Sequence, residues 1–216
     1  MHPQLSREFV TDALSQSILD PRCRALYDLC YIQRDHLRRE AAADKLRMMT
    51  RLYAEQGMLP AGFSLETTTL SLQRACVDCW FSAMATAECL DTALVLSLHK
   101  RLMDLFPELP RAEACALASH YLHFHFPELF FVFDSRVEAV ALVLTRGEGE
   151  VPAGEEQDPG YARFVGACLK LVDGMVPLVG RRLSPRELDR VLRAWVDRRV
   201  VLPALSDEAA LATLHG

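Results

Sequence analysis

The residues with the clearest chemical potential gather in one stretch, residues 119–137. These nineteen residues hold three histidines, five of the ten phenylalanines and the charged corner Asp134-Ser135-Arg136. A carboxylate at a helix start commonly accepts hydrogen bonds from the first amides, whereas a carboxylate in an apolar cleft can stabilise positive charge in a reaction. Asp134 follows an apolar run and precedes an expected helix, so it is either a structural cap or a catalytic group.

The spacing of Ser135 and Glu138 is typical of a capping box, in which a Ser and a Glu three residues later bond each other's backbone amides. It predicts a helix from Ser135 to about Thr145, with Asp134 just before the cap. Because Ser135 satisfies the helix start, Asp134 has no structural duty of its own, and this favours a catalytic role.

Apolar residues recur at helical spacing along most of the chain, and the one run that alternates as a strand does, Leu129–Phe133, is short and isolated. We therefore predict an all-α fold. The expected helices run from Ser6 to about Ile18, from Pro21 through Leu37, through Leu46 to Gly57, from Thr69 to Met84, from Glu88 to Phe106, from Ala112 to His125, from Ser135 to Thr145, from Tyr161 to Asp173, and onward from a second capping box at Ser184–Glu187.

We expect residues 1–216 to form one helical domain with two lobes, about 1–106 and 107–216, around a shared cleft. Pro107 and Pro110 end the first lobe. The acidic segment 147–160 is predicted to be a mobile loop of the kind that can act as a lid.

Composition narrows the class of protein. Half of the 216 residues are apolar, no run reaches the roughly 18 apolar residues that span a bilayer, and the first residues lack a leader pattern. We predict a soluble, cytoplasmic protein that is a monomer and has no membrane partner. The seven cysteines lie mostly in apolar helical patterns, which favours reduced, buried thiols over disulfides.

The net charge of −5 argues against a globally basic nucleic-acid binder, but charge is sorted along the chain. Residues 22–51 hold eight Lys or Arg against four acids, and residues 181–199 hold seven Arg against three acids. Helical spacing aligns Arg34 with Arg38, and Arg186 with Arg190 and Arg193. Each stripe either binds phosphates or is solvated surface.

One larger unit, Leu109–Val137, contains a Leu-Pro turn, an expected helix, the Pro-containing apolar run and Asp134 at the start of the next helix. This unit resembles the signature region of the helix-hairpin-helix DNA glycosylases, where a Leu-Pro-Gly-Val-Gly hairpin precedes a helix and a Phe-Pro-Val-Asp-Thr-His-Val segment follows. On that comparison Asp134 matches the catalytic Asp, Ser135 its Thr, Arg136 its His and Val137 its Val. The family's two-lobed, all-α architecture suits a chain of this size.

The resemblance implies a DNA glycosylase in which Asp134 stabilises the cationic sugar or orients the attacking water. We expect Phe131 and Phe133 to raise the pKa of Asp134 by desolvation. Where bifunctional members carry a Schiff-base lysine this chain has Cys115, so the enzyme should be monofunctional. Arg111 stands at a hairpin glycine and can bind phosphate through its side chain.

A flipped base needs an aromatic pocket. Candidates for that pocket and for binding DNA are Arg136, Ser135, Arg111, His120, His123, Tyr121, Tyr27, Tyr31 and Trp80. The proposed substrate is a damaged or modified base, such as a modified cytosine or a hypermodified phage base, which suggests DNA repair or phage defence.

Histidine and cysteine motifs leave other chemistries open. His120 and His123 share a helix face as two metal ligands would, but no spaced carboxylate or cysteine completes a set, so we expect core-rim histidines and no metal or other cofactor. Cys76-Val-Asp-Cys79 is expected to be a pair of buried thiols. Cys23 and Cys30 have the gap that opens the iron–sulfur loop of some of these glycosylases, but the remaining cysteines are distant, so no cluster is expected.

Two alternatives stand beside the glycosylase. One is a non-catalytic helical adaptor or regulator on a similar scaffold, and the other is a metal hydrolase that uses the histidines. The sequence contains no Walker-type lysine loop, no Gly-x-Ser-x-Gly elbow and no dinucleotide fingerprint, which argues against nucleotide-driven and serine-hydrolase functions.

Overall fold

The computed structural model describes residues 5–15, 21–55, 63–85, 91–149, 151–152 and 154–201, with the backbone alone at 53–55 and 199–201. Within these ranges the protein forms ten helices and no strand, which confirms the all-α prediction. None of the described helices combines the length and apolar composition that crossing a bilayer requires. The helices are α1 (Arg7–Ser15), α2 (Pro21–Ile32), α3 (Arg39–Glu55), α4 (Leu65–Arg74), α5 (Val77–Ala85), α6 (Thr92–Met103), α7 (Arg111–His125), α8 (Ser135–Thr145), α9 (Pro159–Val179) and α10 (Pro185–Val201).

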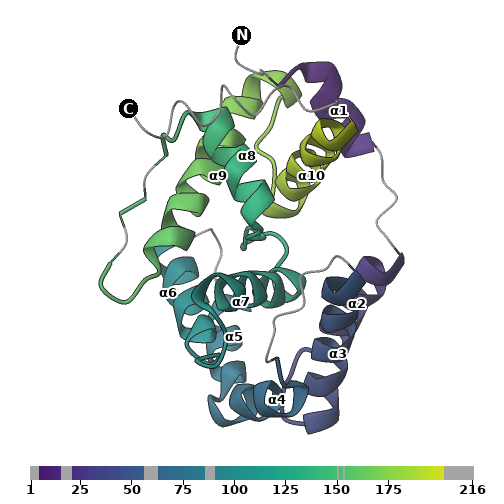
Figure 1. Cartoon of the computed structure of the whole chain (residues 1–216), viewed down its shortest axis with the longest axis vertical. Helices are drawn as coiled ribbons and strands as arrows, with labels where there is room; N and C mark the ends of the chain where they lie inside the picture. The colour runs from purple at the N-terminus through teal and green to yellow at the C-terminus, as the bar shows by residue number, and fades with distance from the viewer. Residues whose placement is uncertain are drawn as a thin grey trace.

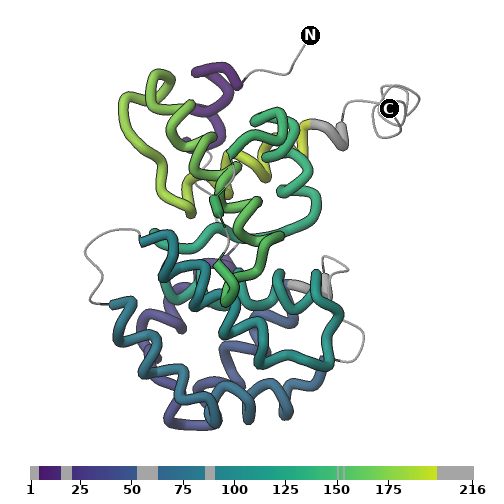
Figure 2. The backbone as a smooth tube through the Cα atoms, turned by 90° about the vertical axis from the view of Figure 1, so that its left-hand side faces the viewer, coloured from purple at the N-terminus to yellow at the C-terminus, as the bar shows by residue number. Residues whose placement is uncertain are grey.

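The helices pack in two groups, which lie one above the other in Figures 1 and 2. The lower group contains α2–α7, in which α3 packs on α2 and α4, α5 on α4, and α7 on α2 and α6. The upper group contains α1 and α8–α10, in which α1 packs on α9 and α10, and α8 also packs on both. The first helix therefore lies with the last three, and α7 packs with helices that precede it in the chain.

The predicted helix from Thr69 to Met84 is in fact two helices, α4 and α5. The break lies at Ala75 and Cys76, and Cys76 has a left-handed φ of 52°. Leu72 and Val77 are both fully buried, although they are five positions apart in the chain. On one straight helix that spacing would place them about 140° apart, and the break allows both to face the core.

The helix starts follow cap chemistry. The Ser6 side chain accepts the Phe9 amide, and Ser184 and Glu187 form the predicted capping box, with Glu187 accepting the Ser184 amide at 3.0 Å. Asp158 caps α9 by accepting the Tyr161 amide at 2.8 Å, and Pro159 occupies the first turn. Helix α9 therefore begins inside the segment predicted to be loop and runs beyond Asp173. The predicted ends at Ile18 and Gly57 lie outside the described residues.

The first residues of the acidic segment pack tightly against α9. A Cβ added to Gly166 would lie 1.5 Å from the Gly149 carbonyl oxygen and 2.9 Å from the Val151 amide nitrogen. Lys170 on α9 also pairs with Glu148. Only a glycine at position 166 permits this approach of two backbones.

We expect Gly166→Ala to lower the free energy of unfolding by about 3 kcal/mol or more, because the loop would have to leave α9. Gly174→Ala is the matched control on the same helix, since nothing lies within 4 Å of an added Cβ there. That variant should gain about 0.5–1 kcal/mol from helix propensity. Urea denaturation measures both, and equal effects of the two substitutions would contradict the packing described.

Candidate functional site

Residues 126–134, the junction loop, carry the chain from α7 in the lower group to α8 in the upper group (Figure 1). Side chains from helices bind its backbone. The Tyr161 hydroxyl donates to the Phe131 carbonyl at 2.8 Å, and the Ser119 hydroxyl accepts the Phe133 amide at 2.9 Å. The Arg186 amide donates to the Pro127 carbonyl at 3.2 Å. Helices of both groups therefore hold the junction loop in place, and this loop positions Asp134.

A chain of two hydrogen bonds runs through the side chain of His123, which is 1% exposed. Its Nδ1–H donates to the Phe130 carbonyl at 2.7 Å, and the Tyr27 hydroxyl lies 2.6 Å from Nε2. Burial lowers the pKa of His123, so the ring is neutral and Nε2 must accept the Tyr27 proton. The phenol of α2 is thereby connected to the junction loop through α7.

Asp134 itself is the N-cap of α8. Its Oδ1 accepts the amides of Arg136 at 2.8 Å and Val137 at 3.4 Å. The prediction that Ser135 caps the helix is wrong, because Ser135 is the exposed first residue of α8 and Glu138 pairs with Arg163 instead of closing a box. Asp134 therefore has a structural duty as the cap of α8, and Ser135 does not release it from that duty.

The second carboxylate oxygen of Asp134 is different. Oδ2 is buried and has no hydrogen-bond partner among the described residues. Such an atom is costly to leave unpaired, and it therefore calls for an explanation beyond helix capping.

The charge state of Asp134 also departs from expectation. Burial acts to raise its pKa, but the Arg136 amide, the Arg136 guanidinium 3.5 Å from Oδ1 and the charge of Arg193 together outweigh burial. The net pKa is lowered. The prediction that Phe131 and Phe133 would leave it raised is wrong, because it omitted the helix amides and these arginines.

The inner face of α10 completes the site. The Arg186 guanidinium lies over the Tyr27 ring, 4.3 Å from its centroid, and Arg193 pairs with Asp189 at 2.9 Å. The negative charge of Asp189 acts to raise the pKa of His123 against the effect of burial. The third arginine, Arg190, donates to the Leu14 carbonyl of α1. These three arginines are half-buried, and the sequence does not reveal that Asp189 belongs to the site.

The junction thus holds two pairs from the predicted set, Asp134 with Arg136 and His123 with Tyr27, and the charge of Arg193 acts on the pKa of Asp134, His123 and Tyr27. His120 joins them, with its Nδ1–H donating to the Ala116 carbonyl at 2.8 Å and its pKa lowered to about 4, chiefly by burial. Hydrogen bonds therefore hold both His120 and His123 in place at the edge of the core.

The other predicted residues lie elsewhere. Tyr121 is fully buried in the lower group. Trp80 is half-buried with the Arg101 guanidinium 5.9 Å from its ring centroid, and Tyr31 is 71% exposed beneath Arg34. Arg111 donates twice to Asp158, at 2.6 and 3.0 Å, so its side chain joins α7 to the start of α9.

Tyr121 belongs to a second buried network. Its hydroxyl lies 2.6 Å from His36 Nε2, and His36 Nδ1–H donates to Asp78 at 2.7 Å. The His125 ring lies beside His36, tilted by 41° with 5.3 Å between the ring centroids. His120, His123 and His125 therefore bind different partners, and across the described residues no group of three or more His, Cys, Asp or Glu side chains is arranged to hold a metal.

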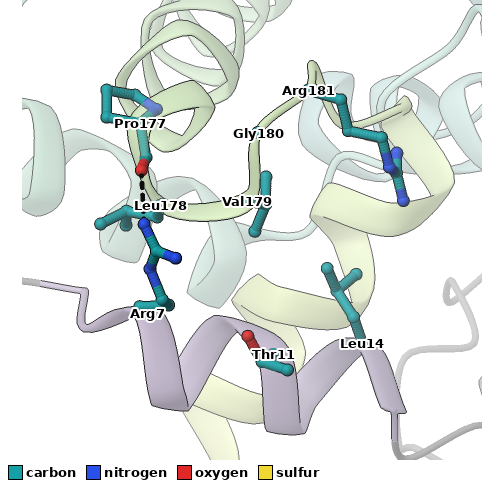
Figure 3. Close-up of a pocket in the computed structure, with 8 residues that line it drawn as sticks. All are labelled: Arg7, Thr11, Leu14, Pro177, Leu178, Val179, Gly180 and Arg181. Atoms are coloured by element: carbon teal, nitrogen blue, oxygen red, sulfur yellow. Dashed lines mark hydrogen bonds between the residues drawn. The ribbon is translucent and has the colours of Figure 1, made fainter.

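A groove of about 430 Å³ lies between α1 and the C-terminal end of α9, and Figure 3 shows the residues that line it. The Arg7 guanidinium crosses it to the Pro177 carbonyl at 3.1 Å. Thr11 and Arg181 are the other polar side chains that line it. No predicted site residue lines this groove, and it offers no base or nucleophile.

Comparison of the chain with protein-family models, with curated proteins and with solved structures finds no match. The geometry at the junction is therefore the basis for assigning a function.

Acid should destabilise the protein, because burial lowers the pKa of His36, His99, His120, His123 and His125. Unfolded histidines titrate near 6.5, so stability is complete above that value and is lost as the pH falls through it toward the folded pKa. With folded values of about 4, His99 and His120 should each cost about 1.3 kcal/mol between about pH 7.5 and about pH 5.5.

Guanidinium denaturation at those two pH values measures the loss. His120→Gln should reduce it by about the contribution of one histidine. A free energy of unfolding that does not change between the two pH values would show that these rings are not buried in the neutral form.

Proposed function

We propose that the protein is a monofunctional DNA glycosylase-like enzyme that hydrolyses the N-glycosidic bond of a damaged or modified base. The observation that carries this proposal is that the two oxygens of the Asp134 carboxylate differ in their hydrogen bonding. One oxygen is fixed by two helix amides, while the other, Oδ2, has no partner among the described residues.

The chemistry of the reaction matches such a group. Breaking an N-glycosidic bond builds positive charge on the sugar, and a preorganised carboxylate can stabilise that charge or orient the attacking water. The lowered pKa keeps Asp134 ionised at neutral pH, so it can act as an anion or a base but not as a general acid. The free Oδ2 is the atom we assign to the sugar cation or the water.

The order of elements supports the same assignment. Helices α6 and α7 are consecutive and packed together, and the turn between them contains Leu109 and Pro110. The junction loop follows, and Asp134 opens the next helix, as in the family that residues 109–137 resemble. Two packed helical groups on either side of this segment are consistent with the two lobes of that family.

The residue at position 115 favours a monofunctional enzyme, because bifunctional members of that family carry their Schiff-base lysine there. Cys115 is buried there, and burial raises the pKa of its thiol, so it is neither an amine nor a ready nucleophile.

We assign the contact with DNA to Arg136, whose side chain is 60% exposed beside Asp134. Its guanidinium can bind a phosphate flanking the extruded nucleotide.

The test is base release from duplexes that carry a panel of damaged and modified bases, including modified cytosines. We expect the wild-type protein to release one of them and to leave alkali-labile sites, without a borohydride-trapped covalent intermediate. Asp134→Asn should slow release by about a hundredfold or more, because it removes the negative charge. Asn still caps a helix, so the fold should persist.

Asp91→Asn is the matched control, since Asp91 caps α6 in the same manner by accepting the amides of Ala93 and Leu94. That variant should release base at the wild-type rate. Equal rates for wild type and Asp134→Asn on a cleaved substrate would rule out the assigned role of Asp134.

A non-catalytic adaptor is the second candidate, and one observation favours it. Tyr31 and Ile32 are the last two residues of α2 and Leu37 precedes α3, and their exposed fractions are 71%, 77% and 81%. Adjacent exposed apolar side chains often mark protein-binding surfaces. Under this alternative the wild-type protein releases no base from any duplex, and substituting these three residues by Ser abolishes partner binding while Asp134→Asn does not.

A further inference from the structure

Two cysteines flank the first turn of α5 on the surface of the lower group. Cys76 immediately precedes the helix, and Cys79 is its third residue. Both carry free thiols and both are exposed, so the prediction that this Cys-x-x-Cys pair is buried is wrong. By contrast Cys30, Cys115 and Cys168 are buried, as predicted.

The two residues between the cysteines explain this exposure. Val77 is 1% exposed, and the Asp78 carboxylate accepts the His36 amide at 2.9 and 3.0 Å and its Nδ1–H at 2.7 Å. Both inner residues are therefore anchored from inside the lower group. The turn is held in place from within while its two thiols face outward.

The geometry of the turn suits a bond between the thiols. The Cys79 amide donates to the Cys76 carbonyl at 2.9 Å, which closes a four-residue turn. The ends of such a turn lie within about 7 Å of each other, and disulfides typically join Cα atoms about 4.4–6.8 Å apart. Cys76 also occupies a left-handed conformation, with φ 52°, that glycine adopts at lower cost. Backbone stability therefore does not account for a cysteine at this position.

Two thiolates supply only half of the tetrahedral set that a structural zinc takes. In the described ranges no third ligand gathers near them to form a metal-binding group. Thiol–disulfide chemistry needs no further ligand.

We infer that Cys76 and Cys79 form a redox-active dithiol that exchanges with a low-molecular-weight disulfide such as oxidised glutathione. One cysteine thiolate attacks the small disulfide, whose S–S bond breaks to release one small thiolate and leave a mixed disulfide on the protein. The other cysteine thiolate then attacks the protein-bound sulfur, forms the Cys76–Cys79 bond and releases the second small thiolate. Two protein thiols are oxidised, one small disulfide is reduced, and the two protons go to the released thiolates.

The test uses the full-length protein with Cys89→Ser, because trypsin leaves Cys76, Cys79 and Cys89 on the single peptide Ala75–Lys100. The folded variant is equilibrated in glutathione buffers from reducing to oxidising, and its free thiols are then alkylated. After digestion with trypsin, the mass of the peptide is measured by mass spectrometry. We expect it to lose two hydrogens under oxidising conditions and to regain two alkylatable thiols under reducing conditions, with the circular dichroism of the protein unchanged.

Adding Cys76→Ser or Cys79→Ser to that variant provides the control. Each should carry one glutathione on its remaining thiol in place of the internal bond. The buried Cys30, Cys115 and Cys168 should resist alkylation throughout and so report that the protein stayed folded. A peptide that keeps two alkylatable thiols, or that carries two glutathiones, at every buffer composition would overturn the inference. Because the assay contains no DNA, its outcome is independent of the proposed glycosylase activity.

Discussion

The hydrogen bonds that side chains donate to the junction loop are the constraint on which the rest of the site depends. A loop that crosses between two helical groups exposes its carbonyls to an apolar interior, and a buried carbonyl without a donor costs about 1–3 kcal/mol. His123 satisfies Phe130, and Tyr161 satisfies Phe131. Because His123 must stay neutral to accept the Tyr27 hydroxyl as well, the same bond network fixes a tautomer, a loop and the position of Asp134.

Asp134 combines two tasks that a sequence pattern treats as alternatives. Its Oδ1 caps α8, and the same helix amides that bind it, together with the Arg136 guanidinium and the charge of Arg193, keep the carboxylate ionised despite its burial. A cap is therefore compatible with a catalytic anion, since the cap orients the carboxylate and leaves Oδ2 unbound. On α10, the charge of Arg193 lowers the pKa of Asp134, and its ion-pair partner Asp189 acts to raise the pKa of His123.

Much of the fold could be predicted, because helical periodicity and strong breakers are local signals. The bounds of α8, the end of α7 before Pro127 and the capping box at Ser184 agree with the sequence for that reason. The break at Cys76 could not be predicted in this way, because neither Gly nor Pro marks it and it depends on burying both Leu72 and Val77.

The site was harder to predict than the fold. Asp134 and Ser135 are both good caps on adjacent positions, and the direction from which the junction loop enters decides between them. Arg186 lies over the Tyr27 ring of α2, and the charge of Arg193 acts on the pKa of His120 and His123 of α7, and a charged stripe in the sequence carries no signal of these contacts. Cys76 and Cys79 lie among apolar residues in the sequence, yet the anchoring of Val77 and Asp78 turns them outward.

The central claim is that the Asp134 anion stabilises a cationic sugar, and it can be tested without knowing the base. The measurement is the affinity of the wild-type protein and Asp134→Asn for duplexes that contain a cationic pyrrolidine abasic-site analogue or its neutral tetrahydrofuran counterpart. The account predicts that the wild type prefers the cationic duplex by about tenfold or more and that the preference disappears in Asp134→Asn. Equal affinity of the wild type for the two duplexes would contradict it.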